Sequence, residues 1–287
     1  MFPEFLNPDI GGPVNDFVDV LVQRYGDEFT AFANVILRVL LLVEKGLRGL
    51  PWWLVLLLTA ALGKVATRSW GGGLITGLLL LMVGILGHWD QAMQTLALMV
   101  IATLITVLIG VPGGIVMASS ATARRLSRPI LDAMQTMPAF VYLIPAIMLF
   151  GLGKVPAILA TVIYALPPLM RMTDLGIRLV DPAVLEAGDA FGARPVQQLL
   201  VIRLPLALPN IMAGINQAIM MALSMVVIAS MIGARGLGEQ VLLGIQRLDV
   251  GQGLTAGLAI VGLAIALDRI SQGLGRRAQI MTGEARG

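Results

Sequence analysis

The sequence contains no cysteine and a single histidine, His88. Structural disulfides and thiolate metal sites are therefore excluded, and one imidazole cannot form a histidine metal cluster. Charged residues are also scarce, at 13% of the 287 residues, whereas 57% are hydrophobic. A water-soluble domain of this size could not build its surface from so few charged residues, so we expect an integral membrane protein.

Charge is missing altogether from four long stretches. No Asp, Glu, Lys, Arg or His occurs in residues 91–123, 133–153, 204–234 or 250–267. Because proton-coupled carriers generally hold a titratable group inside the membrane, we expect the energy for any transport to come from elsewhere. The chain also lacks the phosphate-binding motif G-x-x-x-x-G-K-[ST]. We therefore expect no cofactor in this chain; ATP and its Mg²⁺, if used, would be bound by another subunit.

Seven apolar windows are long enough, or nearly so, to cross a hydrocarbon core of roughly 30 Å. They are residues 51–67, 71–88, 92–119, 134–152, 155–172, 206–232 and 252–270. All four tryptophans lie at the ends of these windows, as interfacial aromatic residues do. We predict an all-α polytopic bundle of about seven transmembrane helices, with a transmembrane domain at 51–275 and a tail at 276–287.

Basic residues are distributed unevenly over the loops between the windows. Of the 20 Lys and Arg, 13 fall in one alternate set of loops and 7 in the other. The positive-inside rule places the richer set in the cytoplasm of a bacterial inner membrane. It predicts that the N-terminus lies outside, and that loop 174–205 and the C-terminus lie inside. Since topology explains the net charge of +3, we expect no nucleic-acid partner.

Region 1–50 is more polar than the rest, and its apolar residues repeat at helical spacing. Two amphipathic helices are expected, separated by Gly26-Asp27-Glu28, and both would lie along the outer membrane interface. A spanning helix over residues 29–50 is the alternative. The apolar residues of the first helix are Val14, Phe17, Val18, Leu21, Val22 and Tyr25, and those of the second are Phe29, Phe32, Ala33, Ile36 and Leu40.

The polar loop at residues 174–205 predicts two short helices. Asp181, followed by proline, is a good N-cap for the first helix. Gly192 can close that helix in the left-handed conformation, and Pro195 can open the second. Pro205 would then turn the chain back toward the membrane. The predicted product is a compact helical knob that can dock in a groove.

The spacing E-A-G-x-x-x-G-x9-I-x-L-P in this loop resembles the cytoplasmic EAA loop of permease subunits of binding-protein-dependent ABC importers. A glycine stands where that motif usually has its second alanine. In the family the loop docks on a cytoplasmic ATPase, and the resemblance also implies the type I importer permease (MetI-like) fold. An amphipathic helix resting on lipid headgroups is the alternative. The coupling residues implied are Asp181, Glu186, Ala187, Gly188, Gly192, Ala193, Ile202, Leu204 and Pro205.

Three further runs, at residues 134–153, 165–168 and 222–233, resemble permeases for glycine betaine and proline betaine. The resemblance implies an osmoprotectant importer with two permease copies, two ATPase subunits and an extracytoplasmic substrate-binding protein. It also implies ATP-driven alternating access, in which the permease itself is not an enzyme. Choline, carnitine and proline remain alternative solutes, and an ATP-independent carrier or channel is the alternative mechanism.

Polar and aromatic residues within the windows are candidates for lining a passage. Interhelical hydrogen bonding and packing use the same residue types, so each candidate has a structural alternative. Because a quaternary ammonium is best selected by an aromatic cage and aromatics are only 5% of the chain, we expect high-affinity selection in the binding protein. The candidates are Gln135, Thr136, Phe140, Tyr142, Tyr164, Asn216, Gln217, Ser224 and Ser230.

Overall fold

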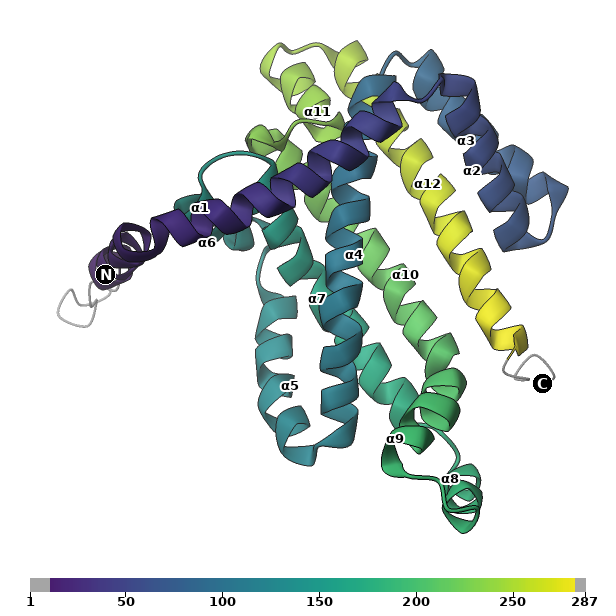
Figure 1. Ribbon diagram of the computed structural model, residues 1–287. Coiled ribbons are helices and arrows are strands. Elements are labelled where there is room, and N and C mark those ends of the chain that lie inside the picture. The colour runs from purple at the N-terminus through teal and green to yellow at the C-terminus, as the bar shows by residue number, and fades with distance from the viewer. Residues whose placement is uncertain (1–10, 282–287) are drawn as a thin grey trace, which may run out of the picture.

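The computed structural model describes the backbone of residues 11–281 and the side chains of residues 11–276. Within that part of the chain every regular element is helical, which confirms the predicted all-α class (Figure 1). In chain order the elements are α1 (Gly11–Gly49), α2 (Trp52–Thr67), α3 (Trp70–Ile85), α4 (Trp89–Ser119), α5 (Ala121–Thr136), η2 (Ala139–Tyr142), α6 (Leu143–Phe150), α7 (Lys154–Arg178), α8 (Pro182–Ala190), α9 (Pro195–Gln197), η3 (Gln198–Arg203), α10 (Leu204–Ala229), η4 (Ser230–Ala234), α11 (Leu237–Gln246) and α12 (Val250–Met281).

Helices α4, α7 and α10 form the centre of the bundle, with α7 in contact with both of the others (Figure 1). Glycine allows these backbones to approach closely. A Cβ at Gly114 of α4 would lie 2.8 Å from the carbonyl oxygen of Met170, and one at Gly176 of α7 would lie 2.6 Å from the Cβ of Asn210. The three central helices therefore pack as one tight unit.

The number of candidate spans is smaller than the seven predicted. Four helical stretches are long and apolar enough to cross a membrane: α4, α7, the continuous stretch Pro195–Ala234, and Val250–Arg276 of α12. The count rises to six if α1 with α2, and α5 with the helix that follows it, each form one bent span. Helices α2 and α3 have only 16 residues each, about 24 Å at 1.5 Å per residue, so neither alone matches the bilayer core.

The predicted window 134–152 is not one helix. Met137 and Pro138 are both extended, with ψ angles of 136° and 140°, and the helices on either side meet at 113°. Proline disfavours the helical conformation of the residue before it, so α5 ends at Thr136. Hydropathy averaged over a window cannot detect such a bend.

The N-terminal region forms two helical segments joined at a kink, as expected, and together they make up α1. Tyr25 has non-helical angles (φ −124°, ψ 16°), next to the predicted break, but the chain continues as α1 on both sides. The first half of α1 extends away from the bundle, whereas the second half crosses the ends of α4 and α7 (Figure 1). At the other terminus, α12 continues to Met281, so residues 276–281 of the predicted tail are helical, and residues 282–287 lie outside the described part.

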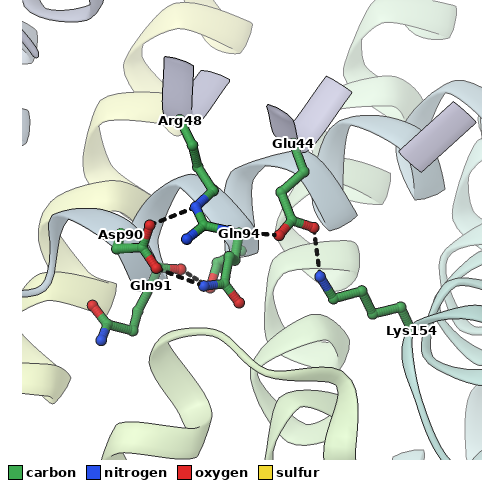
Figure 2. A network of polar contacts seen from close by, with 7 residues as sticks. Glu44, Arg48, Asp90, Gln91, Gln94 and Lys154 are labelled. Carbon is green, nitrogen blue, oxygen red and sulfur yellow. Dashed lines mark hydrogen bonds and ion pairs between the residues drawn. The ribbon is translucent and has the colours of Figure 1, made fainter. Parts of the chain in front are cut away.

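An ion-pair network, buried at Glu44 and exposed at Arg48 and Asp90, holds the second half of α1 (Figure 2). Glu44, only 5% exposed, accepts from Lys154 Nζ at 2.5 Å, and Lys154 is the first residue of α7. Arg48 Nε contacts Asp90 Oδ1 at 2.5 Å, and Asp90 Oδ2 also accepts from Gln94 Nε2 of α4 at 2.8 Å. A buried carboxylate must be paired, so this network fixes where α1 crosses the bundle.

Candidate functional site

Helix α8 and the turn after it, residues 181–194, form a knob beyond one end of the bundle (Figure 1). The helix begins as predicted, because the Asp181 carboxylate accepts from the backbone N–H of Ala183 at 2.9 Å and Pro182 occupies the first turn. It also ends as predicted, since Gly192 adopts a φ of +74°, which glycine takes without strain. The local sequence was therefore sufficient to predict both ends of α8.

The second predicted helix of the loop is not separate. Pro195 opens α9 as expected, but the helix continues through η3 into α10 without interruption. The reason is the π-helical geometry of η3, in which the Leu204 N–H bonds the Leu199 carbonyl five residues back. Pro205 therefore lies in the first turn of α10, where the widened turn accommodates its ring, and does not redirect the chain. The stem that carries the knob is thus continuous with a spanning helix.

A buried glutamine fastens α8 to this helical stem. The Gln198 side chain, 6% exposed, donates to the Leu185 carbonyl at 3.2 Å and to Asp189 Oδ1 at 2.6 Å. Gly188 faces the stem, and a Cβ there would lie 2.8 Å from Ile202 Cδ1. The glycine that departs from the usual motif therefore makes room for the isoleucine of the same motif.

The nine predicted coupling residues divide into two groups in the structure. Gly188 is buried, and Ala193, Ile202 and Leu204 are half-buried, so these four pack inside the loop or against the helices that carry it. Leu204 packs against the small apolar cluster of Ile177, Ala207 and Ile211. The exposed group is Asp181, Glu186, Ala187, Gly192 and Pro205.

The most exposed apolar residue of the knob was missed in the sequence. Phe191 is 93% exposed and directly precedes Gly192. Val184 on α8 and Val196 on α9 are also exposed, at 40% and 65%. An aromatic residue in a polar loop was the available signal, because such residues commonly anchor interfaces. Gln198 could not have been found, since its role depends on the packing of two helices.

The nine candidate passage residues do not form one group. Tyr142 and Tyr164 come together, with ring centroids 6.0 Å apart, and the Tyr142 hydroxyl donates to the Met134 carbonyl. Gln135, Thr136 and Phe140 are exposed around the α5–η2 bend, and Gln217 and Ser224 are exposed on α10.

Two of those candidates have packing roles. Asn216 accepts a hydrogen bond from Ser271 of α12. Ser230 is 1% exposed and donates to the Val227 carbonyl at 2.8 Å. Residues 11–276 contain no group of three or more His, Cys, Asp or Glu side chains able to hold a metal ion.

Comparison with known proteins identifies the family. The model of the family "Binding-protein-dependent transport system inner membrane component" matches residues 110–279, which include the knob and most of the central helices. The permease ProW of the glycine betaine/proline betaine transport system of Salmonella typhimurium is 55% identical over 206 residues, 72% of this chain and 58% of that protein. The chain thus spans less than two thirds of ProW.

Other relatives match along nearly their whole length. The glycine betaine permease OpuAB of Bacillus subtilis is 46% identical over 262 residues, 91% of this chain and 92% of that protein. The glycine betaine/carnitine permease GbuB of Listeria monocytogenes is 44% identical over 274 residues, 93% of this chain and 97% of that protein.

A solved structure shares the fold. A chain of the MetNI methionine ABC transporter in an inward-facing conformation has a TM-score of 0.57 at 22% identity, covering 64% of this chain and 93% of that chain. This likeness supports the predicted MetI-like bundle and nothing about substrate. Given the family match over the knob and the central helices, the chain belongs to the binding-protein-dependent transport system inner membrane components, and is a multi-pass inner membrane permease.

Proposed function

We propose that the protein is the permease subunit of an ATP-driven importer, and that its α8 knob couples it to a separate ATPase. The observation that carries this proposal is that an exposed knob is hydrogen-bonded to a helical stem that continues unbroken into a spanning helix. Glu186 and Phe191 are exposed on the knob, and Gln198 clamps α8 to the stem that continues into α10. A partner that binds the knob and changes its own conformation would therefore move α10.

Movement of α10 would spread through the central bundle. Helix α10 packs on α7 and α7 on α4, with glycines that bring the backbones into close contact. Tightly packed helices shift together, because such contacts resist compression. The unit can thus rock as a rigid body, which is the motion that alternating access requires.

The substrate class we propose is a glycine betaine-type osmoprotectant. OpuAB and ProW are named as permeases for glycine betaine and for glycine betaine/proline betaine, and they are 46% and 55% identical to this chain. The charge-free stretches suit a zwitterion, which needs no charged counterpart in the passage. Related permeases of lower identity are named for trimethylamine N-oxide and choline, at 38% and 34%. Choline, carnitine and proline are the alternative solutes.

The proposed assembly contains two permease copies, two cytoplasmic ATPase subunits and an extracytoplasmic binding protein. Its orientation places the knob in the cytoplasm and the N-terminus outside. Basic residues support this orientation: the start of α5, the helix that contains Arg125 and Arg128, lies toward the same end of the bundle as α8 (Figure 1). By the positive-inside rule that end faces the cytoplasm.

The test compares two exposed apolar residues at opposite ends of the molecule. Phe191→Asp places a charge on the knob, and Leu248→Asp, at a residue 88% exposed in the α11–α12 turn, is the matched control. We expect Phe191→Asp to lose an ATPase that co-purifies in mild detergent, and to lose ATP-dependent uptake of labelled glycine betaine by at least about tenfold, which is roughly 1.4 kcal/mol of docking energy. Leu248→Asp should retain both.

Normal uptake with Phe191→Asp would refute the coupling role of the knob. Uptake that proceeds equally without ATP or ATPase would instead identify a secondary carrier or channel. Failure to bind or transport glycine betaine, with ATP-driven uptake of choline, carnitine or proline, would keep the mechanism and change the solute.

A further inference from the structure

A cavity of about 400 Å³ lies between the α2–α3 turn and the C-terminal part of α12. Arg276 of α12 also lies beside Pro209 and Met212 near the start of α10, the helix that continues from the stem of the knob. Three arginines line it: Arg68 from the turn, and Arg269 and Arg276 from α12. Arg269 and Arg276 are seven residues apart and therefore lie on one face of the helix, two turns from each other. The cavity is thus basic and is built from three helices.

The backbone brings these arginines together. Gly273 lies between Arg269 and Arg276 on the same side of α12, and a Cβ there would lie 2.6 Å from the carbonyl carbon of Ala66. Only glycine lets α12 approach the end of α2 this closely. Arg68, two residues after Ala66, has a φ of +54°, a left-handed conformation that costs a non-glycine residue energy. The fold therefore accepts a strained residue at this turn.

None of the three guanidinium groups forms an ion pair or hydrogen bond with another side chain of residues 11–276. Other arginines of the described chain are paired, such as Arg171 with Asp132 and Arg178 with Asp174. Asp268, which precedes Arg269, has both carboxylate oxygens on Gln272 and does not line the cavity. Three like charges around one cavity repel one another unless an anion joins them.

The other groups at the cavity also suit an anion. Helix α3 begins here, and the partial positive charge of its N-terminus adds to that of the arginines. Ser69, Gly71 and Gly72, from the start of this helix, line the cavity. Planar guanidinium groups with several N–H donors match the oxygens of a phosphate group.

The surroundings of the cavity are those of a lipid-facing surface. Ile75 lines it and is 45% exposed, and Leu74 and Leu78 continue an exposed apolar surface along α3, at 64% and 53%. Trp70 is 78% exposed beside the cavity and lies under Lys64, whose Nζ is 3.1 Å from the ring centroid. Exposed tryptophan with a cation is typical of the membrane interface. Acyl chains of a lipid bound by its headgroup would follow α3.

We propose that this cavity binds the phosphate-bearing headgroup of an anionic phospholipid, with Arg68, Arg269 and Arg276 contacting the phosphate. The bound lipid would join the α2–α3 hairpin to α12 by neutralising charges that otherwise repel. Basic pockets between membrane helices on the cytoplasmic side bind anionic headgroups in this way. The inference concerns a site separate from the knob and does not depend on the proposed substrate.

The experiment is native mass spectrometry of the full-length protein released from mixed phosphatidylglycerol and phosphatidylcholine micelles. We expect the wild type to retain one phosphatidylglycerol per chain in preference to phosphatidylcholine. The variant Arg269→Gln/Arg276→Gln should reduce that retention by at least about tenfold, because each basic residue near a membrane surface contributes substantially to binding an anionic lipid. Arg125→Gln/Arg128→Gln is the matched control: it removes two exposed arginines from α5 and should leave retention unchanged.

Each other outcome overturns the proposal. A wild type with no preference for phosphatidylglycerol refutes it without reference to any variant, so misfolding of the double variant cannot hide a failure. Equal loss in both double variants shows that general surface charge, and not this cavity, holds the lipid. Displacement of the lipid by millimolar inorganic phosphate, or binding of phosphate alone, identifies a soluble anion as the ligand instead.

Discussion

At the scale of single residues, the buried carboxylate of Glu44 sets the position of α1. Glu44 is 5% exposed and is paired with Lys154 at 2.5 Å and with Arg48 at 3.4 Å. The sequence shows the charge of Glu44, but the partner of Glu44, Lys154, lies 110 residues further along the chain. The two residues meet only in the folded protein, in which α1 packs across the start of α7.

Removing only Lys154 from the Glu44–Lys154 pair should lower the free energy of unfolding more than removing both charges. We predict that Lys154→Met lowers the free energy of unfolding by up to about 3 kcal/mol, because Glu44 is left buried with only Arg48 beside it. The double variant Glu44→Gln/Lys154→Met should recover most of that loss. Thermal unfolding in detergent measures both. A double variant less stable than Lys154→Met alone would contradict the buried-pair interpretation.

The single histidine makes stability depend on pH. His88 is 8% exposed at the start of α4, its Nε2 lies 3.0 Å from Thr255 Oγ1, and burial lowers its pKa below the usual value. The unfolded chain therefore binds a proton more readily than the folded chain. The contribution of His88 to stability is complete above about pH 6.5 and is lost as the pH falls toward the lowered pKa.

Unfolding temperatures measured from pH 8 to pH 5 check this prediction. The wild type should lose stability on acidification more steeply than His88→Gln, which cannot titrate. Equal slopes in the two proteins would show that other groups carry the pH dependence.

At the scale of elements, the sequence predicted the helix boundaries that depend on local chemistry. Asp181 with Pro182 starts α8, and Gly192 with a positive φ follows its end. The errors arose where the outcome depends on geometry that a residue pattern does not encode. The π-helical turn before Pro205 keeps η3 and α10 continuous, and the extended Met137-Pro138 pair breaks an apolar window.

The same distinction applies to the candidate site. The motif located the knob, and the structure separates its surface, with Glu186, from its interior, with Gly188 and Ile202. Among the passage candidates, the structure brings Tyr142 and Tyr164 together, a pairing that their spacing in the sequence does not predict. Residue type alone could not distinguish Asn216 and Ser230, which bond to neighbouring groups, from residues that face a passage.

The end of α8 gives a prediction at this scale. Proline cannot adopt the φ of +74° found at Gly192, so Gly192→Pro should displace the chain between α8 and α9. We expect the variant to insert normally and to lose ATP-driven uptake. Gly192→Asn is the matched control, because asparagine tolerates the left-handed conformation, and it should retain most uptake. Normal uptake with Gly192→Pro would show that the shape of the knob is not needed.

At the scale of the whole molecule, the two ends of the bundle differ. The α8 knob lies at the end of the bundle opposite α11 (Figure 1). The basic cavity is lined by the α2–α3 turn and the C-terminal part of α12. The tightly packed α4, α7 and α10 connect the two ends. In our proposal, force enters at the knob and rocks the bundle, while the N-terminal helix α1 covers the opposite end.

The absence of cysteine allows one direct test of this arrangement. Phe191→Cys and Leu248→Cys each introduce a single thiol at an exposed position, one in the turn after α8 and one in the α11–α12 turn. The measurement is labelling by a membrane-impermeant maleimide in inside-out vesicles, before and after the ATPase is stripped from the membrane. We predict that the Phe191→Cys thiol is protected until the ATPase is removed and is then labelled, whereas the Leu248→Cys thiol is not labelled in either state. Labelling of Phe191→Cys that is unaffected by the ATPase, or that occurs only from the outer face, would contradict the account.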